Sequence, residues 1–209
     1  MNTNILVIYY SSYGHIFRMS RAVKEELEKL EDTEVKLVKI PEFESARKNM
    51  STQEAYVKAQ KEQQDIPEAE LEDLAWSDGI IWGIPTRFGN MPAQMKQFID
   101  QAGGLWNEGA LEDTVTGIIS STNTIHGGQE TTIISSMIPM LHLGMIPVGL
   151  PYSENPELFS GEGIGGTPYG PSTVAGPDGS RTPHEDEIKM AVRLGKRVTR
   201  IARSIKESH

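Results

Sequence analysis

Five short apolar runs alternate with amphipathic stretches along this chain, and that alternation limits the possible folds more than any other feature of the sequence. Each run is six residues long and rich in β-branched residues, which is typical of buried strands. Strands that alternate with helices predict parallel pairing through right-handed crossovers. The expected strands are residues 5–10, 35–40, 79–84, 115–120 and 145–150.

Helices are expected between these strands. Apolar residues three and four positions apart give residues 16–30 one buried face. A second helix should begin at Pro92 and end at Gly103-Gly104, and a third should run from about Gly128 through Leu141 with a kink at Pro139. In the third helix, the residues expected to face the core are Ile133, Ile134, Met137 and Leu141.

A last helix is predicted from the sequence "TPHE". Thr182 can cap it, Pro183 can occupy its first turn and Glu185 can complete a capping box. Its expected inward stripe is Ile188, Val192, Val198, Ile201 and Ile205. Together these elements predict an α/β fold: a doubly wound, five-stranded parallel sheet in the flavodoxin-like order 2-1-3-4-5, with helices on both faces.

We expect residues 1–209 to form a single domain with two additions to this plan. Residues 42–74 are polar all round, which predicts a partly helical surface excursion whose simplest interpretation is a solvated insert. Residues 151–181 are rich in glycine and proline and too long for an ordinary connection. A lid, a binding loop or an oligomer contact is expected there.

The composition restricts the classes of function. A formal net charge of -9 and the lack of a basic face argue against a nucleic-acid partner. Zero cysteines exclude disulfides and thiolate chemistry, and the unpaired histidines predict no metal site. With no signal sequence and no apolar run long enough to cross a bilayer, we expect a cytoplasmic protein without membrane insertion.

The ligand of an open parallel sheet binds at the carboxyl ends of the strands, so the loops there are the candidate site. The first loop, residues 11–16 in "YYSSYGHI", offers hydroxyls and backbone N–H groups before a helix. Such a loop can bind a phosphate without a cation, and Gly14 allows close approach. An ordinary turn with a serine cap is the equally weighted alternative.

The second loop, "PTRFGNMP", combines a hydroxyl, a cation, an aromatic ring and a glycine in Thr86, Arg87, Phe88 and Gly89. This mixture suits the edge and face of a flat heteroaromatic ligand, and a cation there stabilises negative charge on a reduced ring. The alternative makes Arg87 a salt-bridge partner and Phe88 a core residue.

The third loop, "SSTNTIHGGQE", again places hydroxyls and amides before paired glycines and a helix. Its N–H groups could face the polar edge of a ring. An esterase is excluded because the chain has no GxSxG nucleophile, and the GxxxxGK[ST] phosphate loop is also absent. Three such loops at one sheet edge favour a single binding site.

These residues resemble the WrbA family of flavodoxin-like NAD(P)H:quinone oxidoreductases across nearly the whole chain. The matching stretches are "YYSSYGHI", "GIPTRFGNMPAQMKQFIDQAGGLW", "HGGQE", "GMIPVGLPY" and "GGTPYGPSTVAGPDGSR". Many members carry two adjacent histidines where this chain has His142-Leu143, and residues 42–74 match poorly.

The resemblance implies non-covalently bound FMN, with its phosphate on the first loop and its ring on the second. No side chain is expected to carry the catalytic step itself, and Arg87 and His142 are possible electrostatic or proton-relay helpers. Substrates are expected near Tyr13 and Trp106. The implied cofactor-binding residues are Ser11, Ser12, Tyr13, Gly14, His15, Ile16, Pro85, Thr86, Arg87, Phe88, Gly89, Ser121, Thr122, Asn123, Thr124, His126, Gly127 and His142.

The resemblance also implies an activity: two-electron (hydride) reduction of quinones to hydroquinones by NADH or NADPH, in a ping-pong mechanism. The expected assembly is a homotetramer, a dimer of dimers, in which neighbouring subunits complete the flavin pockets. The alternatives are a flavodoxin-type electron carrier and a regulatory flavoprotein without pyridine-nucleotide turnover.

Overall fold

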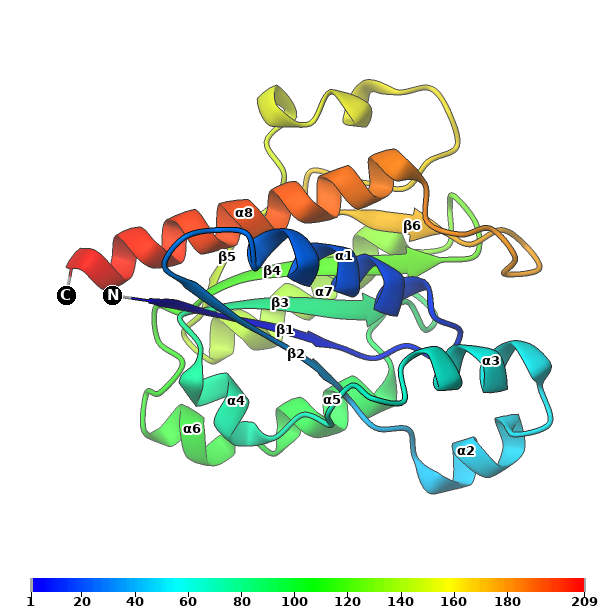
Figure 1. The fold of residues 1–209 in the computed structure, drawn as a ribbon, viewed down its shortest axis with the longest axis horizontal. Helices are drawn as coiled ribbons and strands as arrows, with labels where there is room; N and C mark the ends of the chain where they lie inside the picture. The colour runs from blue at the N-terminus through cyan, green and yellow to red at the C-terminus, as the bar shows by residue number, and fades with distance from the viewer. Residues whose placement is uncertain (1, 209) are drawn as a thin grey trace.

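The sheet of the computed structural model runs in the order β2-β1-β3-β4-β5, as the sequence predicts, and all its strand pairs are parallel (Figure 1). The structure describes residues 2–208. The strands are β1 (Thr3–Tyr9), β2 (Thr33–Lys39), β3 (Gly79–Pro85), β4 (Val115–Thr122), β5 (Ile146–Pro147) and β6 (Ser172–Val174).

The fifth strand position is divided between two short strands. β5 pairs with the start of β4, where Ile146 lies opposite Val115, and β6 pairs with its end, where Ser172 lies opposite Ser120. The expected strand 145–150 was therefore too long. Proline at 147 cannot donate to a ladder, and the chain leaves the sheet before returning at β6.

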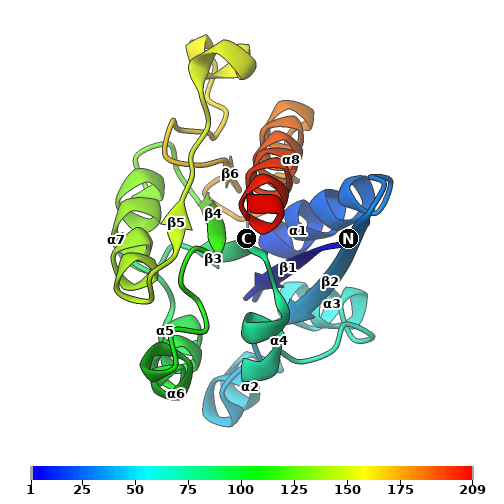
Figure 2. The ribbon, with the colours of Figure 1, turned by 90° about the vertical axis from the view of Figure 1, so that its left-hand side faces the viewer.

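Helices cover both faces of the sheet (Figure 2). On one face α1 and α8 pack over Ile5, Val7 and Ile81, and on the other α4, α5 and α7 pack over Ile8 and Trp82. The helices are α1 (His15–Leu27), α2 (Glu44–Met50), α3 (Glu54–Glu62), α4 (Leu71–Trp76), α5 (Ala93–Asp100), α6 (Gly103–Asn107), α7 (Gln129–His142) and α8 (Glu185–Ser208), with 3-10 turns η1 (Tyr152–Glu154) and η2 (Pro156–Phe159).

The start of α8 differs from the predicted capping box. The helix begins at Glu185, and Glu187 rather than Glu185 reaches back, accepting the backbone N–H of His184 at 2.7 Å. Its buried face is also rotated from the predicted stripe. The fully buried positions include Met190, Leu194 and Val198, while Ile188 and Val192 lie partly exposed beside them.

The reason for this rotation is a close contact between α8 and α1. A Cβ at Gly195 would lie 2.8 Å from Val23 Cγ1, so the smallest residues of α8 must face α1. Ala191 and Ala202 are buried along the same face, and the larger Ile201 and Ile205 flank it.

Two predictions about the other helices were also wrong. Gly103-Gly104 begins α6 instead of ending a helix, because neither glycine adopts the left-handed conformation of a C-terminal cap. In α7, Ile133 is buried as expected, but Ile134 and Leu141 lie on the exposed face together with Ile138. This helix covers an edge of the sheet, so one of its apolar faces has no partner within the described part of the chain (Figure 2).

Residues 42–74 form α2, α3 and α4, so the excursion is helical as expected, but it is not only a solvated insert. Tyr56 and Ala59 of α3 are buried, and Gln63 is 2% exposed. α3 lies beside the loop that precedes α1 (Figure 1). None of the helices between residues 2 and 208 has the length and apolar character to cross a bilayer.

Gly83 in β3 makes the close approach of α1 to the sheet possible. A Cβ at this position would lie 2.5 Å from Ile16 Cγ2 and 2.6 Å from Tyr9 Cβ. We therefore predict that Gly83→Ala lowers the free energy of unfolding by about 1–3 kcal/mol through overpacking. Chemical denaturation measures this change.

Gly103→Ala is the matched control for that substitution. A Cβ at Gly103 has no atom within 4 Å, and alanine is the better helix former, so unchanged or slightly increased stability is expected. Equal losses in the two variants would contradict the packing argument.

Candidate functional site

The loops that follow β1, β3 and β4 meet around one cavity of about 510 Å³ at the carboxyl edge of the sheet. Its size lies within the range of small-molecule sites. Two further segments contribute, one from the excursion and one after β6. The cavity is lined by Ser11, Ser12, Tyr13, His15, Ile16, Gln53, Ala55, Pro85, Thr86, Arg87, Ser121, Thr122, Asn123, Ala175, Pro177, Asp178 and Gly179.

The first loop turns sharply into α1. Gly14 precedes the helix with φ 89°, a left-handed conformation that suits glycine, and its N–H donates to Ser11 Oγ at 3.1 Å. The side chains of Ser11 and Ser12 are buried. Gly14 and not a serine occupies the cap position, and no side chain caps α1, so the predicted serine cap was wrong. The loop is a turn that Ser11 stabilises, with backbone N–H groups at a helix N-terminus.

Arg87 lies against this first loop. One terminal nitrogen donates to Ser12 Oγ at 3.0 Å and the other to the carbonyl oxygen of Thr86 at 2.9 Å. Within residues 2–208 it has no carboxylate partner, so its charge is directed at the cavity and not at a salt bridge.

Besides accepting from Arg87, Ser12 is hydrogen bonded to the buried phenol of Tyr10. Its hydroxyl donates to Tyr10 Oη at 3.0 Å, and Tyr10 Oη donates in turn to the carboxylate of Glu42. Burial and the contact with Glu42 raise the pKa of Tyr10, so its phenol keeps its proton. The side chain of Ser12 is thus held by two hydrogen bonds, one from Arg87 and one to Tyr10.

The second loop is hydrogen bonded to α7 and to the end of β4. Thr86 Oγ1 accepts the N–H of Gly89 at 3.1 Å and the hydroxyl of Thr132 at 2.7 Å. The backbone N–H of Thr86 donates to the Ser121 carbonyl at 2.9 Å. Phe88 is fully exposed with φ 54°, so it is not a core residue.

Several predicted site residues do not line this cavity. Gly14, Phe88, Gly89, Thr124, His126 and Gly127 stand in the same loops but outside the lining. His142 and Trp106 line a separate cavity of about 870 Å³ between α5, α6 and α7. Within one chain, therefore, the structure does not bring these two residues to the loop site.

Other lining residues were not named from the sequence. Gln53 and Ala55 come from the excursion, and Gln53 Oε1 accepts the hydroxyl of Tyr13 at 2.8 Å. Ala175 and Pro177 to Gly179 come from the segment after β6. Two signals pointed to the second group: the prediction of a lid, binding loop or oligomer contact within residues 151–181, and the family match of "GGTPYGPSTVAGPDGSR". The polar composition of the excursion concealed the first group.

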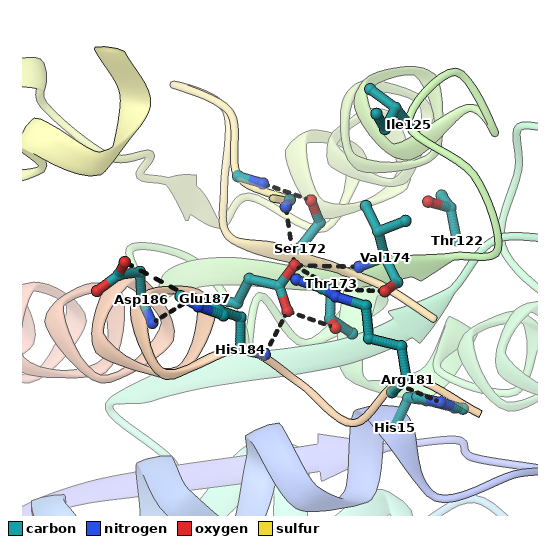
Figure 3. Close-up of polar contacts among 12 residues, drawn as sticks. His15, Thr122, Ile125, Ser172, Thr173, Val174, Arg181, His184, Asp186 and Glu187 are labelled. Atoms are coloured by element: carbon teal, nitrogen blue, oxygen red, sulfur yellow. Dashed lines mark hydrogen bonds and ion pairs between the residues drawn. The ribbon is translucent and has the colours of Figure 1, made fainter. Parts of the chain in front are cut away.

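A fully buried carboxylate, Glu187, organises the segment after β6 (Figure 3). Its two oxygens accept five hydrogen bonds within 2.7 to 3.3 Å from four segments of the chain. The donors are the N–H groups of Gly165, Val174 and His184, the hydroxyl of Thr173 and the guanidinium of Arg181. Burial alone would raise the pKa of Glu187, but these donors lower it below the ordinary carboxyl value.

His15 connects this cluster to the first loop. Its Nε2 lies 3.1 Å from the carbonyl oxygen of Arg181, and because a carbonyl can only accept, Nε2 carries the proton (Figure 3). Burial, followed by the positive charge of Arg18, lowers the pKa of His15 and keeps the ring neutral at pH 7. Glu187 thereby holds a wall of the cavity against the first loop.

The cavity fits a flat ring that carries a phosphate monoester, such as FMN. N–H and hydroxyl groups stand at one end, Arg87 supplies a single positive charge, and no lysine is needed for a phosphate that is not transferred. Ser121, Thr122 and Asn123 also line the cavity and add hydroxyl and amide groups that can hydrogen bond to a polar ligand.

Comparisons with known proteins agree with this geometry. A family model described as NADPH-dependent FMN reductase matches residues 3–155. The NAD(P)H dehydrogenase (quinone) of Aromatoleum aromaticum is 46% identical over 201 residues, 96% of each chain. The protein of the same name from Methanosarcina acetivorans is 44% identical over 205 residues, 95% of this chain and 96% of its own length.

Solved structures support the fold independently. A flavodoxin, WrbA-like protein from Agrobacterium tumefaciens superposes with a TM-score of 0.67 at 22% identity, covering 97% of this chain and 99% of its own. Flavodoxin 1 from Bacillus cereus superposes with a TM-score of 0.57 at 14% identity, covering 95% and 98%. At these identities the superpositions establish the flavodoxin-like fold.

We predict that Glu187→Gln lowers the free energy of unfolding by about 2 kcal/mol at pH 7, because the amide leaves buried donors unmatched. Since folding lowers the pKa of Glu187, its stabilising contribution is complete above the ordinary carboxyl value and is lost as pH falls through the lowered pKa. The difference between wild type and variant should therefore shrink in acid. Urea titrations over a pH series measure it.

Glu185→Gln is the matched control, two residues earlier in α8. Glu185 is exposed and pairs only with Lys189 at the surface, so a change below about 0.5 kcal/mol is expected. A pH-independent difference for Glu187→Gln would show that the charge of Glu187 is not what stabilises the fold.

Proposed function

Because this chain belongs to the NADPH-dependent FMN reductase family, and within it to the NAD(P)H dehydrogenases (quinone), we propose that the cavity of its three strand-end loops is the FMN site of that activity. The predicted resemblance to WrbA-type, flavodoxin-like NAD(P)H:quinone oxidoreductases is confirmed by these relatives together with the WrbA-like structural neighbour. The protein is an FMN-dependent oxidoreductase that transfers two electrons from NAD(P)H to a quinone. The observation that carries the site assignment is the convergence of the three loops on one cavity, with Arg87 directed into it.

The proposed binding mode gives each loop one part of the cofactor. Residues 11–16 hold the phosphate through N–H and hydroxyl groups, Thr86, Arg87 and Phe88 hold the ring, and residues 121–127 meet its polar edge. Ten of these residues line the cavity, and so does the predicted Pro85, which supports the assignment. The exposed ring of Phe88 and the half-exposed ring of Tyr13 are free to meet a bound flat molecule.

FMN, when bound, supplies the two-electron chemistry, and NAD(P)H and quinone would use the same face in turn, as a ping-pong scheme requires. The chain's own contribution is electrostatic and positional. The guanidinium of Arg87 stabilises negative charge at the ring, and the strand-end hydroxyls fix its orientation. His15 and Asp178 line the cavity, and water or a histidine such as His142 would supply the protons that convert the reduced quinone to hydroquinone.

We propose that the working form is a homotetramer in which neighbouring subunits contribute Trp106 and His142. Both residues are exposed and line the second cavity, away from the loop site of their own chain. The apolar residues Ile134, Ile138 and Leu141 are exposed on α7 near that cavity, and a face of this kind is typical of a subunit interface.

We place the enzyme in the cytoplasm, which a chain without cysteines is compatible with.

The activity is tested by sequential addition. Purified protein supplied with FMN should turn yellow, bleach when NADH or NADPH is added, and recover its colour when benzoquinone follows. Comparing NADH with NADPH under the same conditions identifies the preferred donor. Bound flavin that neither donor reduces would instead support an electron carrier or a regulatory flavoprotein.

The assembly is tested by placing a charge on the exposed face of α7. Ile138→Glu should lower the oligomeric mass in sedimentation velocity and reduce quinone turnover, because burial of an unpaired carboxylate opposes association. The matched control is Val57→Glu on α3, since Val57 is 49% exposed and Ile138 is 55% exposed. A tetramer that survives Ile138→Glu would remove α7 from the interface.

A further inference from the structure

The helix α3 of the excursion holds the outer side of the first loop. Two glutamines make this contact: Gln60 lies in the last turn of α3, and Gln63 follows directly after the helix. Gln60 Nε2 donates to the carbonyl oxygens of Ser11 at 3.1 Å and Ser12 at 3.0 Å. Gln63 Nε2 donates to the Ser11 carbonyl at 3.0 Å.

These bonds fix the direction of the neighbouring N–H groups. The carbonyl of Ser11 and the N–H of Ser12 belong to one planar trans peptide, so they point in opposite directions, and the same holds for the carbonyl of Ser12 and the N–H of Tyr13. Carbonyls held toward α3 therefore turn both N–H groups away from α3. Ser12 and Tyr13 line the loop cavity, Gln60 and Gln63 line a different cavity of about 380 Å³, and Ser11 lies between the two and lines both.

Gln63 and the end of α3 are fixed by contacts with the sheet and with α1. Gln63 is 2% exposed, and its Oε1 accepts the hydroxyl of Tyr9 at 2.9 Å. Lys39 Nζ, at the end of β2, donates to the carbonyl oxygen of Gln63 at 2.9 Å. Glu62 pairs with Arg18 of α1 at 2.8 Å. Residues 60–63, which we call the clamp, are therefore anchored on β1, β2 and α1.

We propose that Gln60 and Gln63 are positioning residues that preorganise the first loop to receive a phosphate monoester. This inference rests on the proposed FMN site and assigns the excursion a role in it. Without the two amides, the Ser11 and Ser12 carbonyls would be free to rotate toward the cavity, where they would repel an anion. When both carbonyls already point away from the cavity before the phosphate binds, the binding free energy is not reduced by the free energy needed to reorient them.

The test compares FMN with riboflavin, which has the same ring and no phosphate. Gln60→Met keeps the length of the side chain and removes both of its donors. On flavin-free protein, flavin fluorescence should show an FMN dissociation constant raised about ten-fold, the scale of one or two lost hydrogen bonds. The riboflavin dissociation constant should change less than about two-fold, because riboflavin does not engage the clamped N–H groups.

Gln64→Met is the matched control, since Gln64 is exposed and only its backbone is hydrogen bonded. It should leave both affinities unchanged. Gln60→Glu, compared with Gln64→Glu, provides a second pair if the methionine variant does not fold. The carboxylate keeps the shape of glutamine but cannot donate to a carbonyl, and the control carries the same added charge.

An unchanged FMN affinity in Gln60→Met overturns the proposal. An equal loss for FMN and riboflavin also overturns it, because a general loosening of the fold would not distinguish the two. If wild-type protein itself binds riboflavin as tightly as FMN, the first loop does not bind the phosphate, and the proposed role of Gln60 and Gln63 fails as well. The NAD(P)H and quinone assay separates that result from a failure of the proposed activity.

Discussion

Burial of the sheet on both faces is the constraint on which the rest of the structure depends. The strands β1, β3 and β4 are almost entirely buried, so helices must cover both faces, and only the strand ends can reach a ligand. Parallel strands place all their carboxyl ends at one edge. The loops after them meet there for geometric reasons, whatever their sequences, and their hydroxyls, glycines and single arginine then determine what can bind.

Two segments that do not belong to the minimal fold hold the first loop from separate sides. The excursion contributes Gln60 and Gln63, which bind its carbonyls, and the segment after β6 contributes the Arg181 carbonyl, which binds His15. Each is secured by a buried polar group whose hydrogen bonds are satisfied, Gln63 in one case and Glu187 in the other. Buried polar groups of this kind hold a backbone in one arrangement, which a site made of N–H groups requires.

In the proposed tetramer, the exposed apolar face of α7 meets a neighbouring subunit. Trp106 and His142 stand at a second cavity, and the apolar residues beside them are exposed. The cofactor loops, by contrast, need no neighbour to reach their arrangement. This division suits an enzyme whose cofactor site is formed within the subunit and whose substrate site is shaped by assembly.

The sequence by itself determined the strand order, the buried faces of α1 and α5, and the three loops that line the cavity. These depend on local periodicity and on residue types such as Gly14 and Arg87, whose roles follow from backbone geometry and charge. Where close contacts between distant segments decide the outcome, local patterns were insufficient. The rotated face of α8 depends on the approach of α1 to Gly195, and the divided fifth strand depends on where the chain returns to β4. Glu187 and Gln60 look like surface residues in the sequence, and only the tertiary structure gives them partners, because those partners lie on segments that the chain brings together after folding.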